Sequence, residues 1–144
     1  MSVLTFRAAT EADIPFLLEL RRQTMSEHLR LSGVDPSDSE RRARVLANFE
    51  SAEIILLAGA QVGLLKVVRD PDNWDLVQIQ ILPEKQGGGL GSSILKKLID
   101  DAVQAHVSVS LSVLKVNPAR RLYERLGFRI VGENEQAYDM LYGE

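Results

Sequence analysis

The segment that most constrains the fold is a glycine-rich turn, Gln86-Gly87-Gly88-Gly89-Leu90-Gly91, between a strand-like run and a helical pattern. The run before it, residues 76–82, is apolar or alternating and is closed by Pro83. Apolar residues recur after it at helical spacing, namely Ile94, Leu95, Leu98, Ile99 and Ala102. The pattern predicts a strand-to-helix turn whose consecutive backbone NH groups are not covered by side chains.

Such a turn is suited to holding a phosphate group. A helix N-terminus carries about half a positive elementary charge, and its first NH groups have no partner within the helix. The dinucleotide-binding fingerprint needs a glycine where Ile94 stands, and the nucleoside triphosphate loop needs a lysine directly after Gly91, where Ser92 stands. On the glycines alone, a tight turn without any ligand remains an alternative.

A second informative segment is residues 117–128, which predict one short helix. Asn117 is suited to the N-cap, Pro118 to the first helical position and Gly127 to the position just past the end. Tyr123 lies at the edge of the apolar stripe formed by Ala119, Leu122 and Leu126. Its phenol can therefore point into a cleft. The simpler interpretation is that Tyr123 is a core-edge tyrosine without a function in a cleft.

Together, the two segments resemble the GNAT superfamily of N-acetyltransferases. The residues that match its two motifs are Gln86, Gly89 and Gly91, followed by Asn117, Ala119, Tyr123, Gly127 and Phe128. The order of the other elements is also similar, so the resemblance covers nearly the whole chain. It implies one α/β domain over residues 1–144, with the single-domain GNAT acyltransferase fold of a mixed central sheet flanked by helices.

The resemblance also implies an acetyl-CoA-dependent N-acyltransferase. An acetyl group would pass from acetyl-CoA to a primary amine of a small molecule or peptide, by direct transfer in a ternary complex. The implied CoA-binding residues are Ile81 and Leu82 beside the pantetheine arm, the turn residues Gln86, Gly87, Gly88, Gly89, Leu90, Gly91 and Ser92 at the pyrophosphate, and Asn117. An NH group near Ile81 would donate to the developing oxyanion. Tyr123 corresponds to the tyrosine often assigned as general acid for the leaving thiolate, with orientation of the thioester as its alternative role.

The candidate for the general base is Asp75, eleven positions before Gln86, where several relatives carry a glutamate. Because aspartate is one methylene shorter, the carboxylate would act through a bridging water. Gln78 and Gln80 are expected on the same strand face, where they can order that water. An aspartate without function at the start of a strand is the alternative.

Composition excludes several function classes. The net charge of −3 and the lack of a basic run argue against nucleic acid as a partner. No run approaches the roughly 20 apolar residues needed to span a membrane, and Arg7 and Glu11 near the start do not fit a signal peptide, so a cytoplasmic protein is expected. The absence of cysteine rules out an acyl-cysteine intermediate. His28 and His106 are interpreted as surface histidines with no third ligand nearby, so no metal site is expected.

Acidic residues are expected to gather near the acceptor, which favours a cationic amine. They are Asp70, Asp72, Asp75, Glu133, Glu135 and Asp139. Two other classes of function remain open. One is a CoA-binding sensor or interaction module without turnover. The other is a structural or homodimeric domain with an exposed aromatic and apolar strand face formed by Trp74, Tyr138, Met140 and Tyr142.

The remaining elements follow from local patterns. Strands are predicted at residues 3–8, 53–58, 62–68, 107–113, 128–131 and 138–142, with a crossover between the fourth and fifth strands of the chain. Thr10 and Asp13 form a capping box before a helix whose apolar stripe is Ile14, Leu17, Leu18, Met25 and Leu29. After a break at 32–36, Ser37 and Glu40 cap a second helix that is predicted to run to about Phe49.

Overall fold

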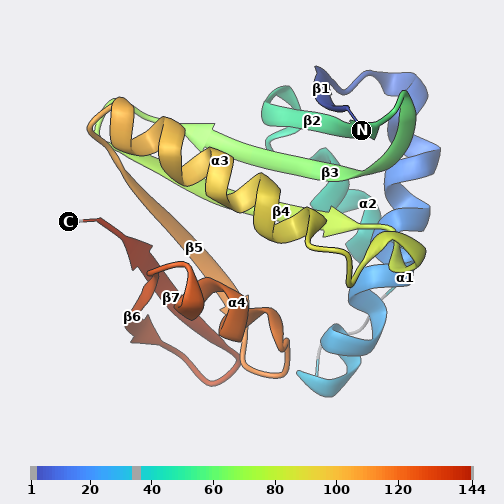
Figure 1. The fold of residues 1–144 in the computed structure, drawn as a ribbon. Coiled ribbons are helices and arrows are strands. Elements are labelled where there is room, and N and C mark those ends of the chain that lie inside the picture. The colour runs from blue at the N-terminus through green and yellow to red at the C-terminus, as the bar shows by residue number, and fades with distance from the viewer. Residues whose placement is uncertain (1–2, 34–36, 144) are drawn as a thin grey trace.

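The computed structural model describes residues 3–33 and 37–143, which form one seven-stranded sheet in the order β1-β2-β3-β4-β5-β7-β6 (Figure 1). The strands are β1 (Leu4–Ala8), β2 (Ala52–Leu57), β3 (Ala60–Arg69), β4 (Asn73–Ile81), β5 (Ser108–Leu114), β6 (Arg129–Glu133) and β7 (Ala137–Tyr142). The helices are α1 (Ile14–Leu31), α2 (Asp38–Leu46), α3 (Leu90–Gln104) and α4 (Ala119–Arg125). The predicted α/β class and the crossover are confirmed, because β4 and β5 pair in parallel while the other neighbours are antiparallel.

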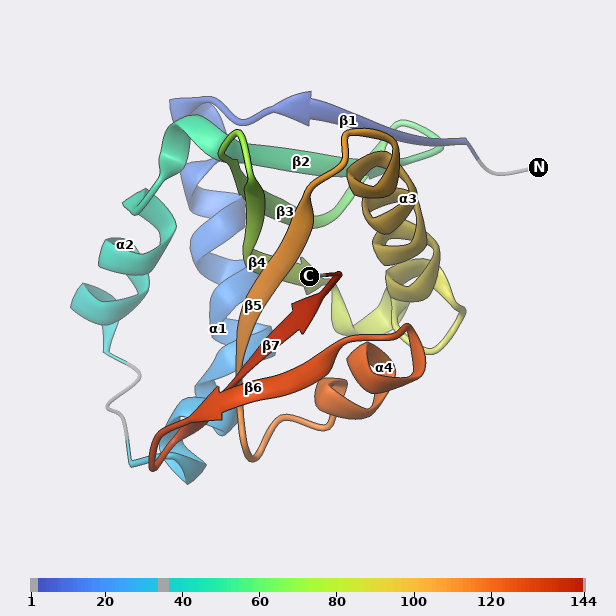
Figure 2. The ribbon, with the colours of Figure 1, turned by 90° about the vertical axis from the view of Figure 1, so that its left-hand side faces the viewer.

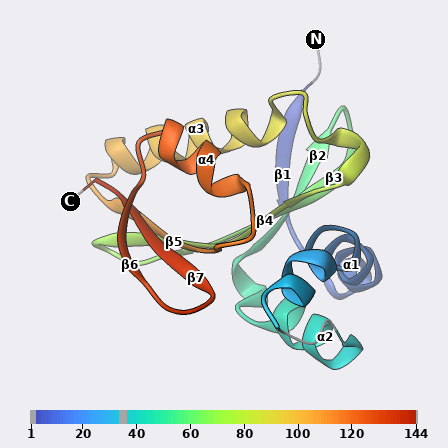
Figure 3. The ribbon, with the colours of Figure 1, turned by 90° about the horizontal axis from the view of Figure 1, so that it is seen from below.

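Two layers of helices cover the sheet. Figure 3 shows α3 and α4 on one face and α1 and α2 on the other, and the turned view in Figure 2 agrees. A larger core cluster, with Leu95, Leu98 and Val109, fills the α3 and α4 side. A smaller one, with Leu17, Leu20 and Leu64, fills the α1 and α2 side. The predicted apolar stripes therefore face the sheet, as amphipathic helices require.

The site depends on the divergence of β4 and β5. Their parallel pairing runs only from Asn73↔Ser108 to Leu76↔Leu111, and the two strands then separate, as their V-shaped course in Figure 1 shows. On the other side, β4 stays paired with β3 to Ile81, apart from one register shift between Lys66 and Val67. Beyond Leu76, β4 therefore has an edge that no strand covers.

A buried carboxylate fixes the start of α1 against β1. Asp13, only 5% exposed, accepts hydrogen bonds from Arg7 Nη1 (2.8 Å), Arg7 Nη2 (2.9 Å), the Thr10 NH (2.8 Å) and Gln61 Nε2 (3.1 Å). The predicted capping box is thus present. The Arg7 guanidinium, followed by the Thr10 NH, holds the pKa of the Asp13 carboxyl well below its usual range.

We expect Asp13→Asn to lower the free energy of unfolding by about 2 kcal/mol or more, because the change leaves the Arg7 charge without its partner. The pKa of Asp13 is depressed in the folded state, so its stabilisation is present above the unfolded value of 3.8 and is lost as the pH falls below it. Urea denaturation between pH 7 and pH 3 measures both effects. The variant should lose less stability on acidification than the wild type. Glu11→Gln, an exposed position in the same turn, is the matched control.

The structure corrects the predicted end of the second helix, because α2 ends at Leu46 and not near Phe49. Asn48 adopts a left-handed φ of 53°, which breaks the helix. The buried Lys66 side chain binds the freed carbonyls, with Nζ donating to Arg44 O, Val45 O (both 3.1 Å) and Ala47 O (2.6 Å). The predicted break at 32–36 lies partly outside the described residues.

The proposed exposed strand face is also wrong. Met140 is 1% exposed and belongs to the larger core cluster, and Trp74, Tyr138 and Tyr142 are partly buried against the same cluster. Phe128 packs on Tyr142 with 5.7 Å between ring centroids. These aromatic residues therefore contribute to the core. Of the helices in the described ranges, none is long and apolar enough to cross a membrane.

Candidate active site

The glycine-rich turn presents a row of free backbone NH groups. Gly87 and Gly89 have φ values of 85° and 84°, a left-handed conformation that favours glycine, and α3 begins directly after Gly89. The Ser93 NH donates to Gly89 O (3.0 Å), whereas the NH groups from Gly87 to Ser92 donate to no other residue that the structure describes. These donors and the positive end of the α3 dipole together favour an anion.

A cavity of about 520 Å³ lies beside this turn, and we call it the glycine-side cavity. It lies between α1, the end of β4, the turn and α4. The predicted CoA-binding residues that line it are Ile81, Gln86, Gly87, Gly89, Leu90, Gly91, Ser92 and Asn117. Gly88 and Leu82 do not line it. His28, predicted to be a surface residue, is half-buried and lines this cavity, as does Arg125.

The two backbone groups of Leu82, at the end of β4, are already hydrogen-bonded within the protein. Its NH donates to Val62 O on β3 (2.9 Å) and its carbonyl accepts from the Lys85 NH (2.8 Å), so both groups already have partners. Backbone groups alternate in direction along a strand, so the NH and carbonyl of Ile81 point away from β3, toward the gap beside β5. Gln86 Nε2 donates to that carbonyl (2.8 Å). The Ile81 NH is thus the predicted donor that faces the gap.

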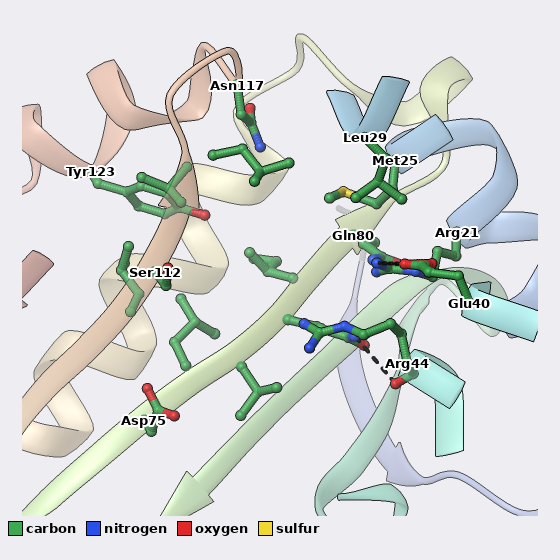
Figure 4. Close-up of a pocket in the computed structure, with 17 residues that line it drawn as sticks. Arg21, Met25, Leu29, Glu40, Arg44, Asp75, Gln80, Ser112, Asn117 and Tyr123 are labelled. Carbon is green, nitrogen blue, oxygen red and sulfur yellow. Dashed lines mark hydrogen bonds and ion pairs between the residues drawn. The ribbon is translucent and has the colours of Figure 1, made fainter. Parts of the chain in front are cut away.

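Asn117 lies across the gap from Ile81. The predicted N-cap position is wrong by one residue, because α4 begins at Ala119 and Pro118 occupies the cap position. Asn117 Oδ1 nevertheless accepts a hydrogen bond from the Ala119 NH (2.9 Å). Since the oxygen is engaged, the amide orientation is set and Nδ2 is directed into the open space (Figure 4).

Tyr123 lines both this cavity and a second one. Tyr123 is 7% exposed, and its ring packs edge-on against Phe128 with 5.8 Å between centroids, whereas the hydroxyl points into open space (Figure 4). Burial raises the pKa of the Tyr123 hydroxyl to about 12. The phenol is therefore protonated throughout the physiological pH range and can donate a proton or a hydrogen bond.

The second cavity, of about 580 Å³, lies on the side of α1 and α2, and we call it the helix-side cavity. Its walls are α1, α2 and the diverging strands β4 and β5 (Figure 4). The two cavities share the residues Met25, Ile79, Gln80, Asn117 and Tyr123. Two molecules that entered from opposite sides would therefore meet beside Tyr123.

Asp75 lines the helix-side cavity but not the glycine-side cavity. It is exposed, and its Oδ1 accepts a hydrogen bond from the Ser110 hydroxyl (3.1 Å). Four residues of strand, roughly 13 Å, separate it from Ile79 at the shared boundary. The carboxylate therefore does not reach that boundary directly.

A bulge in β4 puts three polar side chains on one face. In a regular strand, Asp75 and Gln78 would point to opposite faces. Here Val67 pairs with Leu76 and Lys66 with Gln78, so Val77 is an extra residue and the alternation shifts by one. Asp75, Gln78 and Gln80 consequently share the face toward α1 and α2, as predicted. Gln78 Nε2 donates to Arg44 O (3.3 Å), which ties this face to α2.

Three charged residues of the helix-side cavity were missed by the sequence analysis: Arg21 on α1, and Glu40 and Arg44 on α2. Arg21 is buried, and its Nη2 donates to Glu40 Oε1 (2.8 Å). The sequence contained a signal that Arg21 faces the interior, because it stands four residues after Leu17 and four before Met25, inside the apolar stripe. Of the six acidic residues expected near the acceptor, only Asp75 lines this cavity.

Residues 3–33 and 37–143 contain no side-chain cluster suited to a metal ion. No group of three or more histidine, aspartate or glutamate side chains there is placed to hold an ion.

Comparison with known proteins gives a consistent result. The sequence profile of a family described as "Acetyltransferase (GNAT) domain" matches residues 50–130. No curated protein sequence matches the chain. Among solved structures, an acetyltransferase from Thermus thermophilus is similar, with a TM-score of 0.76, 22% sequence identity and coverage of 96% of each chain.

Two further structures share the fold. The PaiA N-acetyltransferase from Thermoplasma acidophilum, in complex with coenzyme A, has a TM-score of 0.75 and 12% identity over 99% of each chain. The ribosomal-protein-S18-alanine N-acetyltransferase from Escherichia coli has a TM-score of 0.71 and 21% identity, over 97% of this chain and 93% of that one. At these identities the likeness concerns the fold.

Proposed function

Because the chain belongs to the GNAT acetyltransferase domain family, whose members use acetyl-CoA, we propose that it transfers the acetyl group directly to a primary amine in a ternary complex. The observation that carries the proposal is the pair of cavities that meet beside Tyr123. One has the anion-binding turn, and the other is open for an acceptor. We propose that the domain extends over residues 1–144.

In this proposal acetyl-CoA occupies the glycine-side cavity. Its pyrophosphate accepts hydrogen bonds from the NH groups between Gly87 and Ser92, and its pantetheine arm lies along the uncovered edge of β4. Asn117 Nδ2 donates to that arm from the other side of the gap. The thioester then reaches the shared boundary of the two cavities, with its carbonyl oxygen near the Ile81 NH.

The acceptor amine attacks the thioester carbon from the helix-side cavity. The new C–N bond forms and the C–S bond breaks, with the oxyanion held by the Ile81 NH in between. Tyr123 donates its hydroxyl proton to the leaving thiolate. The chain has no cysteine, which supports direct transfer without an acyl-cysteine intermediate. Holding both reactants in place supplies much of the rate.

The test is release of free CoA thiol from acetyl-CoA in the presence of a panel of primary amines, with mass spectrometry of the acetylated product. Acetylated amine formed in proportion to free thiol supports the proposal. Thiol release without acetylated product would mean hydrolysis and contradict it. CoA binding without any turnover would favour the sensor or interaction module.

Asp75 is the proposed general base, acting through waters ordered by Gln78 and Gln80 because of its distance from the boundary. We expect Asp75→Asn to lower kcat/KM near neutral pH by about tenfold or more and to remove the acidic limb of the pH profile. Part of the rate should return at higher pH, where more of the amine is already deprotonated. Asp72→Asn, in the exposed turn before β4, is the matched control. An unaltered profile in the Asp75 variant would assign proton removal to water or to the substrate.

A further inference from the structure

The α1–α2 wall of the helix-side cavity carries an unpaired cation. The Arg44 side chain extends from α2 toward the middle of the cavity (Figure 4), and it makes no hydrogen bond or ion pair with the residues that the structure describes. Behind it, the buried Arg21 is already paired with Glu40 at 2.8 Å. Within the part of the chain that the structure describes, the Arg44 guanidinium is therefore available to a ligand.

The wall has an excess of positive charge. Arg21 and Arg44 line it, and Glu40 is the one acid among the described residues that line this wall. The fully buried Lys66 does not line the cavity but lies behind the wall, where its Nζ donates to Arg44 O. Desolvation by burial lowers the pKa of Lys66 to about 8, and the charges of Arg44 and Arg21 act in the same direction, whereas the charge of Glu50 opposes them. An anion placed at Arg44 would relieve this repulsion.

The cavity also contains buried polar atoms without partners. Among the described residues, Gln78 Oε1, Gln80 Oε1, Arg21 Nε and Glu40 Oε2 are buried and make no hydrogen bond. All four residues line the helix-side cavity. Buried polar atoms are nearly always hydrogen-bonded, and leaving one without a partner costs about 1–3 kcal/mol. Such a set is typical of a cavity that receives a polar ligand.

We propose that the acceptor is a small amino acid, with a carboxylate bound by the Arg44 guanidinium and an amine presented beside Tyr123 and Gln80. This inference rests on the proposed function and narrows its acceptor. A guanidinium binds a carboxylate through two parallel hydrogen bonds. Arg44 is the one cation without a partner among the described residues that line this wall, which matches a singly charged carboxylate, whereas a phosphate dianion would need a second such cation. Both ends of the acceptor lie in one cavity of about 580 Å³, which fits a small molecule.

The test compares matched pairs of acceptors that differ only in the carboxylate. Suitable pairs are glycine and glycinamide, β-alanine and β-alaninamide, and glutamate and its α-amide, which also vary the distance between amine and carboxylate. We expect kcat/KM for at least one free acid to exceed that of its amide by tenfold or more, since a hydrogen-bonded charge pair is worth that factor or more.

The variant Arg44→Gln should then raise KM for the preferred amino acid by at least tenfold and leave KM for acetyl-CoA unchanged. Arg44→Glu should reverse the preference, so that the amide becomes the better acceptor. The matched control is Arg42→Gln, because Arg42 is exposed on α2, as Arg44 is, but lines neither cavity. Thermal unfolding checks whether the variants are folded. The comparison of each free acid with its amide is made on the wild-type protein and does not depend on the variants.

The outcomes separate this inference from the proposed function. If amides, simple amines or peptide N-termini are acetylated as well as or better than the free acids, the enzyme is a transferase and the carboxylate inference is wrong. If nothing is acetylated, calorimetric titration of the protein–CoA complex with the same acids and amides decides whether the carboxylate site exists. Binding of an acid that Arg44→Gln abolishes would support the carboxylate site, and no binding of any acid would overturn it.

Discussion

Replacement of Gly91 by phenylalanine should abolish measurable binding of CoA while the protein stays folded. A Cβ at this position would lie 3.5 Å from Ile81 Cδ1, and Gly91 lines the glycine-side cavity, so the ring would enter the space in front of the turn, where we propose that the pyrophosphate binds. Loss of two hydrogen bonds to a charged phosphate alone corresponds to about 100-fold or more in affinity. Calorimetric titration with CoA measures the effect.

Gly91 is the better position for this test than Gly89, because Gly89 has a φ of 84° and any side chain there strains the backbone as well. Gly91 lies in the first turn of α3 without such a constraint, and glycine is a poor helix former, so the substitution should not weaken α3. Lys96→Phe is the matched control. Lys96 is an exposed residue of α3 that lines neither cavity and lies outside the glycine-rich turn. Unchanged CoA affinity in a folded Gly91→Phe protein would rule out the turn as the phosphate site.

The second large effect is expected from Tyr123→Phe, which should lower kcat by tenfold or more and leave the Kd for CoA nearly unchanged. A proton donor acts on the leaving thiolate in the transition state and contributes little to ground-state binding, and general acid catalysis is worth about 10²- to 10⁴-fold. The packing on Phe128 involves the ring, which phenylalanine retains. Steady-state rates at saturating acceptor and acetyl-CoA measure the change.

The pH profile adds a second readout for Tyr123. Because its pKa is raised to about 12, the hydroxyl does not lose its proton between pH 6 and pH 10, so Tyr123 should produce no fall in kcat in that range. Tyr138→Phe, on β7 outside both cavities, is the control for loss of a phenol as such. Equal kcat values for Tyr123→Phe and wild type would leave Tyr123 with an orienting role only.

Local sequence was sufficient for the elements whose signals lie within a few residues. The capping box at Thr10 and Asp13, the cap at Ser37 and the glycine-led start of α3 all involve groups within one turn of each other in the chain. Such interactions do not depend on the rest of the fold. Where an element's end depends on a distant residue, the prediction failed. The end of α2 is set in part by Lys66, about twenty residues further along the chain.

The same distinction between local and distant determinants applies to the candidate site. Most of the glycine turn and Asn117 line one cavity, and both are defined by backbone geometry that short motifs encode. Leu82 does not line it, and its backbone groups are bound by Val62 and Lys85, a pairing that depends on the register of β3 against β4. Register is a property of two strands and cannot be derived from one.

By itself, the sequence determined the α/β class, the crossover, the glycine-rich turn before α3 and the position of Tyr123 at the edge of the core, because these follow from periodicity, glycine conformations and caps within single segments. Only the tertiary structure decided which residues line the helix-side cavity. Each of its features involves segments that are far apart in the chain. These features are the V-shaped opening between β4 and β5, the bulge at Val77, and the proximity of Arg21 on α1 to Glu40 and Arg44 on α2. Charges meet in a cavity only after the sheet and helices have packed, so the charge balance of that cavity is a property of the fold.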